Sequence, residues 1–73
     1  MRASREDVAE VLTVTINYAV PHATLLVPKI VEAILSDLTI LDRKDDLESV
    51  LSGFVDPREA ASLRQLLQTI QPL

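Results

Sequence analysis

Four prolines and a single glycine divide the chain into segments, and each segment repeats its apolar residues at helical spacing. Apolar residues three and four positions apart fall on one face of an α-helix. We therefore predict an all-α fold, a small antiparallel bundle of four helices at approximately 5–20, 24–39, 43–52 and 57–71. Short connections make successive helices neighbours, and we expect residues 1–73 to form one helical domain.

The first segment predicts a helix that begins after Ser4, a residue type that caps helix N-termini well. Its expected core face consists of Val8, Val11, Leu12, Thr15, Ile16 and Ala19. Residues 12–18 also alternate apolar and polar side chains, as a strand would. Helix is favoured because no second segment is available to pair with such a strand.

The second segment carries the widest apolar face of the chain, and we expect it at the centre of the fold. This face consists of Leu26, Val27, Ile30, Val31, Ile34, Leu35 and Leu38. Thr24 is the candidate N-cap, which would place Pro28 at the end of the first turn. A proline there costs little helix stability.

The third and fourth helices are predicted mainly from residue types that are typical of helix ends. Asp42 is the predicted N-cap of the third helix, and Gly53 is predicted to end it in a left-handed conformation. Asp56, Pro57 and Glu59 together predict a capped N-terminus with a capping box. The fourth helix then presents a narrow apolar seam, made of Ala60, Leu63, Leu66, Leu67 and Ile70.

The composition leaves little room for catalysis or cofactor chemistry. The chain has 73 residues, no Cys and one His, so disulfides, thiolate metal sites and His clusters are excluded. No Ser or Asp lies at a recognisable catalytic spacing from His22, which we interpret as an exposed or capping residue. The single glycine excludes a glycine-rich phosphate loop. We expect no enzyme activity, no cofactor and no metal.

The net charge is −4, and the acidic residues concentrate in 32–48. An acidic chain is repelled by nucleic acid and by anionic membranes, so neither is an expected partner. Asp42, Asp45 and Asp46 form the densest cluster. Their place at a helix N-terminus explains them, although they could also dock electrostatically on a basic surface. The N-terminal residues lack signal-peptide features, and we expect a cytoplasmic location.

The remaining function class is protein binding, and the apolar faces supply the candidate surface. Val14 and Tyr18 are four residues apart and form a second ridge beside the main stripe of their helix. Together with the wide second face, they predict these contact residues: Val14, Tyr18, Leu26, Val27, Ile30 and Ile34. We expect a regulatory module of the antiactivator, inhibitor or adaptor type, which binds another protein.

Three alternatives remain open. Both faces could be consumed by the bundle's own core, or they could be buried in a homodimer. The third alternative is a helix-turn-helix-like regulator associated with DNA. In that case the polar side of the fourth helix would read DNA, through Arg58, Arg64, Gln65, Gln68 and Gln71.

Overall fold

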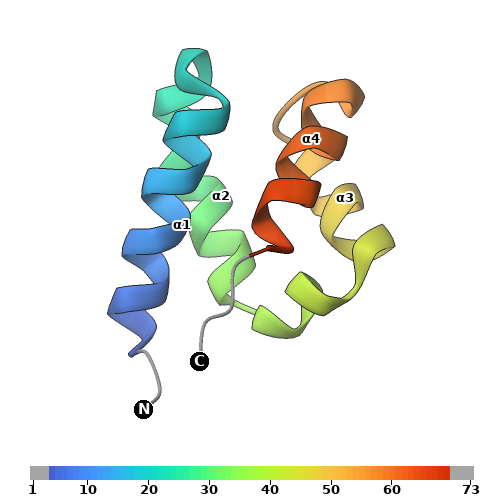
Figure 1. Ribbon diagram of the computed structural model, residues 1–73. Coiled ribbons are helices and arrows are strands. Elements are labelled where there is room, and N and C mark those ends of the chain that lie inside the picture. The colour runs from blue at the N-terminus through green and yellow to red at the C-terminus, as the bar shows by residue number, and fades with distance from the viewer. Residues whose placement is uncertain (1–3, 70–73) are drawn as a thin grey trace.

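The computed structural model describes residues 4–69, which contain four α-helices, two 3₁₀ helices and no strand. The elements are α1 (Arg5–Ala19), η1 (Pro21–Leu26), α2 (Val27–Leu35), η2 (Leu38–Asp42), α3 (Lys44–Ser52) and α4 (Pro57–Leu67). Figure 1 shows that successive α-helices run in alternating directions. The prediction of an all-α fold with four helices is confirmed.

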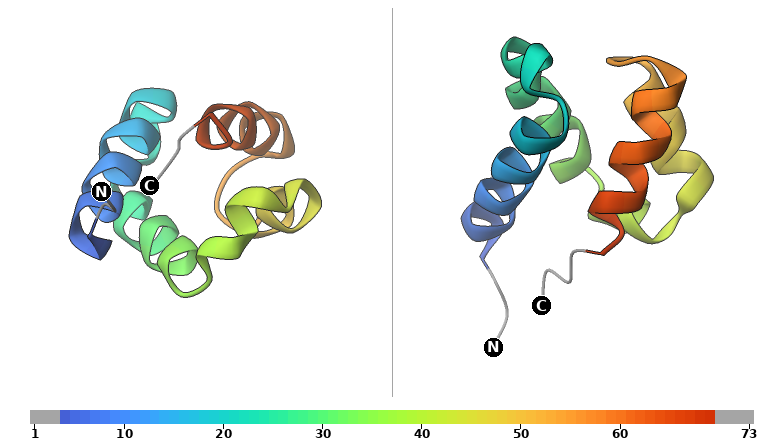
Figure 2. Two further views of the ribbon diagram at one scale, coloured as in Figure 1. Left: turned by 60° about the horizontal axis from the view of Figure 1, so that its bottom comes forward. Right: turned by 45° about the horizontal axis from the view of Figure 1, so that its top comes forward.

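The four helices pack as two hairpins. α1 lies beside α2 and α3 lies beside α4, and both pairs remain adjacent in the two views of Figure 2. The hairpins meet mainly where α1 contacts α4, with a smaller contact between α2 and α3. Helices joined in this way bury one face each against a common centre.

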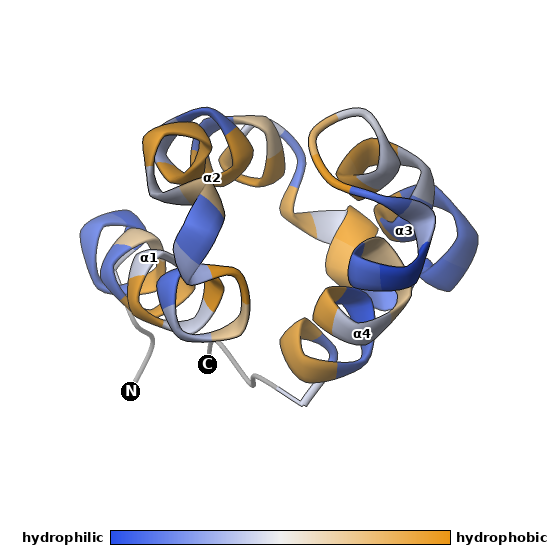
Figure 3. Cartoon of the chain, turned by 90° about the horizontal axis from the view of Figure 1, so that it is seen from above, coloured by the Kyte–Doolittle hydropathy of each residue, from blue (hydrophilic) through white to orange (hydrophobic). Residues whose placement is uncertain are grey.

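The core is built from aliphatic side chains of every element. Its fully buried large members are Leu12, Ile16, Val27, Ile30, Ile34, Leu47, Leu51, Leu63 and Leu67. Hydrophobic positions cluster toward the centre in Figure 3, whereas the outer sides of α3 and α4 are hydrophilic. Full burial of each such side chain stabilises the fold by about 1.5–3 kcal/mol relative to exposure.

The start of α1 agrees with the sequence. Ser4 caps the helix, since its Oγ accepts the N–H of Asp7 at 3.1 Å and the Asp7 carboxylate accepts the N–H of Ser4 at 3.3 Å. This reciprocal pair is a capping box. Residues 12–18 are helical, so the strand interpretation is wrong. α1 ends at Ala19, two residues before Pro21, where a proline restricts the preceding backbone to extended conformations.

The start of α2 differs from the prediction. Thr24 does not cap it, because its hydroxyl donates to the carbonyl of Pro21 at 2.7 Å, within the η1 segment. α2 begins at Val27, which places Pro28 in the first turn, where a missing N–H costs nothing. A helix begun at Leu25 would press the Pro28 ring against the carbonyl of Thr24.

The connection from α2 to α3 also differs. α2 ends at Leu35, earlier than the predicted 39, and the Asp37 side chain accepts the N–H of Thr39 at 3.1 Å to begin η2. Asp42 is therefore the last residue of η2, and the N-cap of α3 is Arg43, without a side-chain capping bond. The prediction of Asp42 as N-cap is wrong because the chain already turns at Asp37.

The turn from α3 to α4 needs no left-handed residue. Gly53 has φ −75° and ψ −12°, and the helix closes by tightened turns in which the Phe54 N–H donates to the Leu51 carbonyl at 2.9 Å. The left-handed prediction for Gly53 is wrong. Asp56 is the N-cap residue of α4, with Pro57 in the first turn, but its side chain makes no capping bond. α4 ends at Leu67, with Gln68 as its C-cap residue, so the predicted end at residue 71 is wrong. Ile70, a residue of the predicted apolar seam, lies outside the described residues.

Candidate functional site

α1 carries a second apolar face that the fold leaves uncovered. Val11, Val14 and Tyr18 are 45%, 64% and 83% exposed, and we call these three residues the α1 ridge. Their spacing of three and four residues places them along one side of the helix. The opposite side faces the core through Val8, Leu12 and Ile16.

A shallow hollow borders the N-terminal half of the ridge. Its volume is ≈ 420 Å³, and it is lined by Asp7, Glu10, Val11, Val14 and Thr15. Every lining residue comes from α1, so the hollow is the flank of a helix that no neighbour covers. Apolar side chains and two carboxylates therefore share this stretch of surface.

A second hollow continues from the C-terminal end of the ridge onto α4. Its volume is ≈ 470 Å³, and its lining residues are Tyr18, Ala19, Ser62, Gln65, Leu66 and Thr69. Leu66 is half-buried here, so the apolar seam of α4 is not wholly consumed by the core. The ridge thus extends across a helix boundary and presents a surface built by both hairpins.

The predicted contact residues of the second helix lie elsewhere. Val27, Ile30 and Ile34 are 1%, 0% and 0% exposed, and Leu26 is half-buried against the same core. The structure therefore does not bring them together with Val14 and Tyr18 on one surface. Their placement on an exposed face is wrong, because α1, α3 and the two 3₁₀ helices all contact α2 and cover it.

Sequence reasoning also missed one ridge residue. Val11 was assigned to the core face, yet it is nearly half exposed. The available signal was its position three residues before Val14 and seven before Tyr18, which is the spacing of one helix side.

The acidic cluster is exposed but partly neutralised. Arg43 lies within it, 2.9 Å from a carboxylate oxygen of Asp37 and 3.4 Å from one of Asp46. The Thr39 hydroxyl donates to Asp37 and is the main reason why the pKa of that carboxyl is lowered. Lost hydration opposes this shift, and the Thr39 N–H and the Arg43 charge add to it. The remaining members of the predicted cluster, Asp42 and Asp45, are exposed.

The polar side of α4 is engaged within the fold at Arg64 and Gln68, whereas Arg58 and Gln65 are exposed. The Arg64 side chain is 11% exposed, and its Nε lies 2.9 Å from Oε1 of Glu48 on α3. Its Nη1 donates to the Gln68 amide oxygen at 2.9 Å, and the Gln68 nitrogen donates to the Leu41 carbonyl at 3.4 Å. Arg64 and Gln68 are thus not free to contact bases, so the predicted DNA-reading face loses its central residues. Gln71 lies outside the described residues.

His22 joins the two hairpins. Its Nε2 lies 2.7 Å from a carboxylate oxygen of Glu59 on α4, and the two side chains are 64% and 29% exposed. Glu59 therefore contacts η1 instead of closing the predicted capping box. Within residues 4–69, no group of three His, Cys, Asp or Glu side chains is arranged to hold a metal ion.

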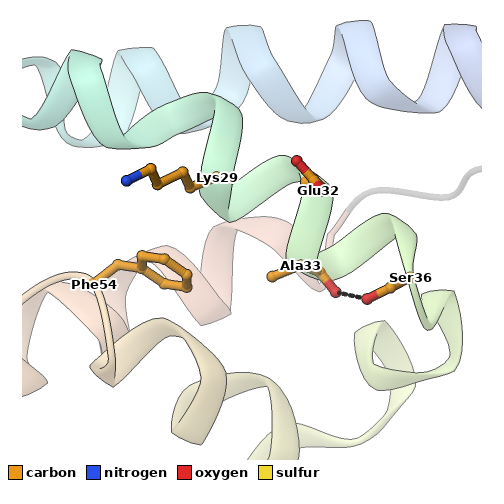
Figure 4. Close-up of a pocket in the computed structure, with 5 residues that line it drawn as sticks. All are labelled: Lys29, Glu32, Ala33, Ser36 and Phe54. Atoms are coloured by element: carbon orange, nitrogen blue, oxygen red, sulfur yellow. Dashed lines mark hydrogen bonds between the residues drawn. The ribbon is translucent and has the colours of Figure 1, made fainter.

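A further hollow lies between α2 and the α3–α4 turn, where the ring of Phe54 faces α2 (Figure 4). Its other lining residues are Lys29, Glu32, Ala33 and Ser36, and its volume is ≈ 410 Å³. The Ser36 hydroxyl donates to the Ala33 carbonyl at 2.7 Å, so its hydrogen is already engaged. No buried side-chain polar atom of the described residues lacks a partner. The two charged side chains of this hollow, those of Lys29 and Glu32, are both exposed.

These features define a small all-α domain whose most distinctive surface is an uncovered apolar helix side. Comparison with known proteins identifies no relative: no family model, no curated protein and no solved structure matches the chain. No helix within residues 4–69 has both the length and the apolar character that a membrane span requires.

Proposed function

We propose that this protein is a small regulatory binding module, of the antiactivator, inhibitor or adaptor type, that binds another protein through the α1 ridge. The observation that carries the proposal is the exposure of Val11, Val14 and Tyr18 on a helix whose other side is fully buried. Contiguous apolar side chains on a surface mark contact sites. A tyrosine in such a patch is a frequent energetic anchor of protein interfaces.

The ridge is not needed to complete the core. The core residues of α1 lie on the other side of the helix, and they are between 0% and 5% exposed without any contribution from Val14 or Tyr18. Polar side chains at the ridge would leave this core intact. The apolar character of the ridge therefore needs another explanation, and a partner that covers it supplies one.

The proposal is tested by site-specific photocrosslinking in the native host. Benzoylphenylalanine replaces Tyr18 in one strain and exposed Ser49, on α3, in a matched control strain. We expect a crosslinked partner protein with the probe at position 18 only. Adding Val14→Asn to the position-18 probe should reduce the product, since a buried amide without a hydrogen-bond partner is costly at an interface.

Two results would contradict the proposal. One is the same set of products from positions 18 and 49, which would indicate nonspecific capture. The other is a product of twice the monomer mass as the sole species at position 18, which would assign the ridge to a homodimer.

A further inference from the structure

The charged side chains that line the hollow at the N-terminal half of the α1 ridge are both acidic, whereas the exposed Arg58 of α4 lies near Ala19, beyond the C-terminal end of the ridge. Asp7 and Glu10 line this hollow, and the sequence contains no Lys or Arg from Glu6 to Pro28. Arg5, the nearest base in the chain, precedes Val8 by three residues and therefore lies toward the core-facing side of α1. The N-terminal half of the ridge is thus an apolar strip with an acidic border.

Glu10 is the most available of these carboxylates. It is exposed and makes no salt bridge within residues 4–69, whereas Asp7 already accepts the Ser4 N–H of the capping box. The other end of the ridge, beside Leu66, is bordered by the uncharged Ser62, Gln65 and Thr69. The surface therefore has an acidic end and a neutral end, which gives it a direction.

We infer that the occupant of the α1 ridge is an amphipathic helix of the partner protein, with a Lys- or Arg-rich border that lies beside Asp7 and Glu10. This inference rests on the proposed function. Residues 4–69 present no strand edge to which an extended peptide could add, whereas a helix side with residues at i, i+3 and i+7 is the usual partner of another helix.

Charge complementarity distinguishes this occupant from a second copy of the chain. Each copy has a net charge of −4, so a dimer brings two acidic molecules together. A helix with a basic border instead neutralises the carboxylates that flank the ridge. Such attraction raises the association rate and orients the partner.

The test uses two synthetic helical peptides with the same leucine stripe, one bordered by lysines and the other by glutamates. Each is titrated into the ¹⁵N-labelled full chain. We expect the lysine peptide to shift the amide signals of Val11, Val14, Thr15 and Tyr18, and the glutamate peptide to shift none. Glu10→Gln should weaken binding of the lysine peptide by about two- to fivefold, the upper range for one exposed ion pair.

Glu32→Gln is the matched control, because Glu32 is equally exposed but lies on α2, at the hollow beside Phe54. It should leave the affinity unchanged. The inference is overturned by equal binding of the two peptides, by no binding of the lysine peptide, by equal effects of the two variants, or by shifts centred on Asp42–Asp46. If Tyr18 crosslinking nevertheless captures a partner protein, the proposed function stands and only the basic helix is rejected.

Discussion

The two halves of the molecule differ in how their polar side chains are used. Among the described residues, the half formed by α1, η1 and α2 contains no salt bridge of its own, although its His22 lies 2.7 Å from the Glu59 carboxylate of the other half. The half formed by η2, α3 and α4 contains three salt bridges. Two join Arg43 to Asp37 and Asp46, and the third joins Arg64 to Glu48.

This difference indicates that the residues that stabilise the fold through charge and the residues proposed to bind a partner lie largely in different halves. Charged side chains of the second half stabilise its own turns and helix contacts. In the first half, the helix hairpin is held by apolar packing, and the α1 ridge on its outward side is apolar and exposed. The α1 ridge therefore lies on the half that, within residues 4–69, contains no salt bridge of its own.

The largest effect should come from the core, and it should be the same in both halves. Ile16→Ala and Leu63→Ala each remove a side chain that is 0% exposed, and each should lower the free energy of unfolding by about 2–5 kcal/mol. Val14→Ala, on the same helix as Ile16, should change it by less than about 0.5 kcal/mol. Urea denaturation measures all three. A loss for Val14→Ala as large as that for Ile16→Ala would show that the ridge belongs to the fold.

An intermediate effect should distinguish the second half. Arg64→Ala removes both the contact with Glu48 and the buried stem of the side chain, and should cost about 1–2 kcal/mol. Arg64→Met retains most of the stem and should cost less. The Arg64→Ala loss should shrink at high salt, since Glu48 is 40% exposed. A salt-independent loss, equal in both variants, would contradict the ion-pair explanation.

The smallest effect should come from Asp37, where the second half begins. Its folded pKa lies below the ordinary value of 3.8, so its ionised form stabilises the fold above pH 3.8, and this contribution is lost as the pH falls through the folded value. Asp37→Asn should therefore be slightly less stable than the unmodified chain near neutral pH, with the difference vanishing in acid. Asp45→Asn is the control. Denaturation curves from pH 2 to pH 7 measure the effect, and a difference that grows toward low pH would refute it.

Helical periodicity predicts the number of helices and most of their positions because a one-sided apolar pattern must be buried against a neighbour. The ends of the helices are harder to predict from the sequence. Thr24, Asp42 and Gly53 are residue types suited to the roles predicted for them, but each role depends on the geometry of the adjoining turn. For Thr24 and Asp42, that geometry is instead determined by Pro28 in the first turn of α2 and by the hydrogen bond that the Thr39 N–H donates to the Asp37 carboxylate.

The candidate site could be predicted only in part for a related reason. Spacing identifies Val14 and Tyr18 as a ridge apart from the main stripe. Spacing alone does not show which apolar face is buried by the rest of the chain. That depends on how segments far apart in the sequence pack against each other. Ile30 and Ile34 are covered by the rest of the bundle, whereas Val11, assigned to the core, remains nearly half exposed.

The two apolar sides of α1 also have a consequence for the unfolded chain. From Val11 to Val20 the sequence has no charge and no proline, and it is rich in β-branched residues. Such a stretch is a template for intermolecular β-sheet and amyloid-like growth when its backbone is free. In the folded chain, the hydrogen bonds of α1 engage that backbone. Solubility during heating or prolonged storage should therefore decrease as the fraction of molecules with an unfolded α1 increases. A charged residue in place of Val14 would delay precipitation.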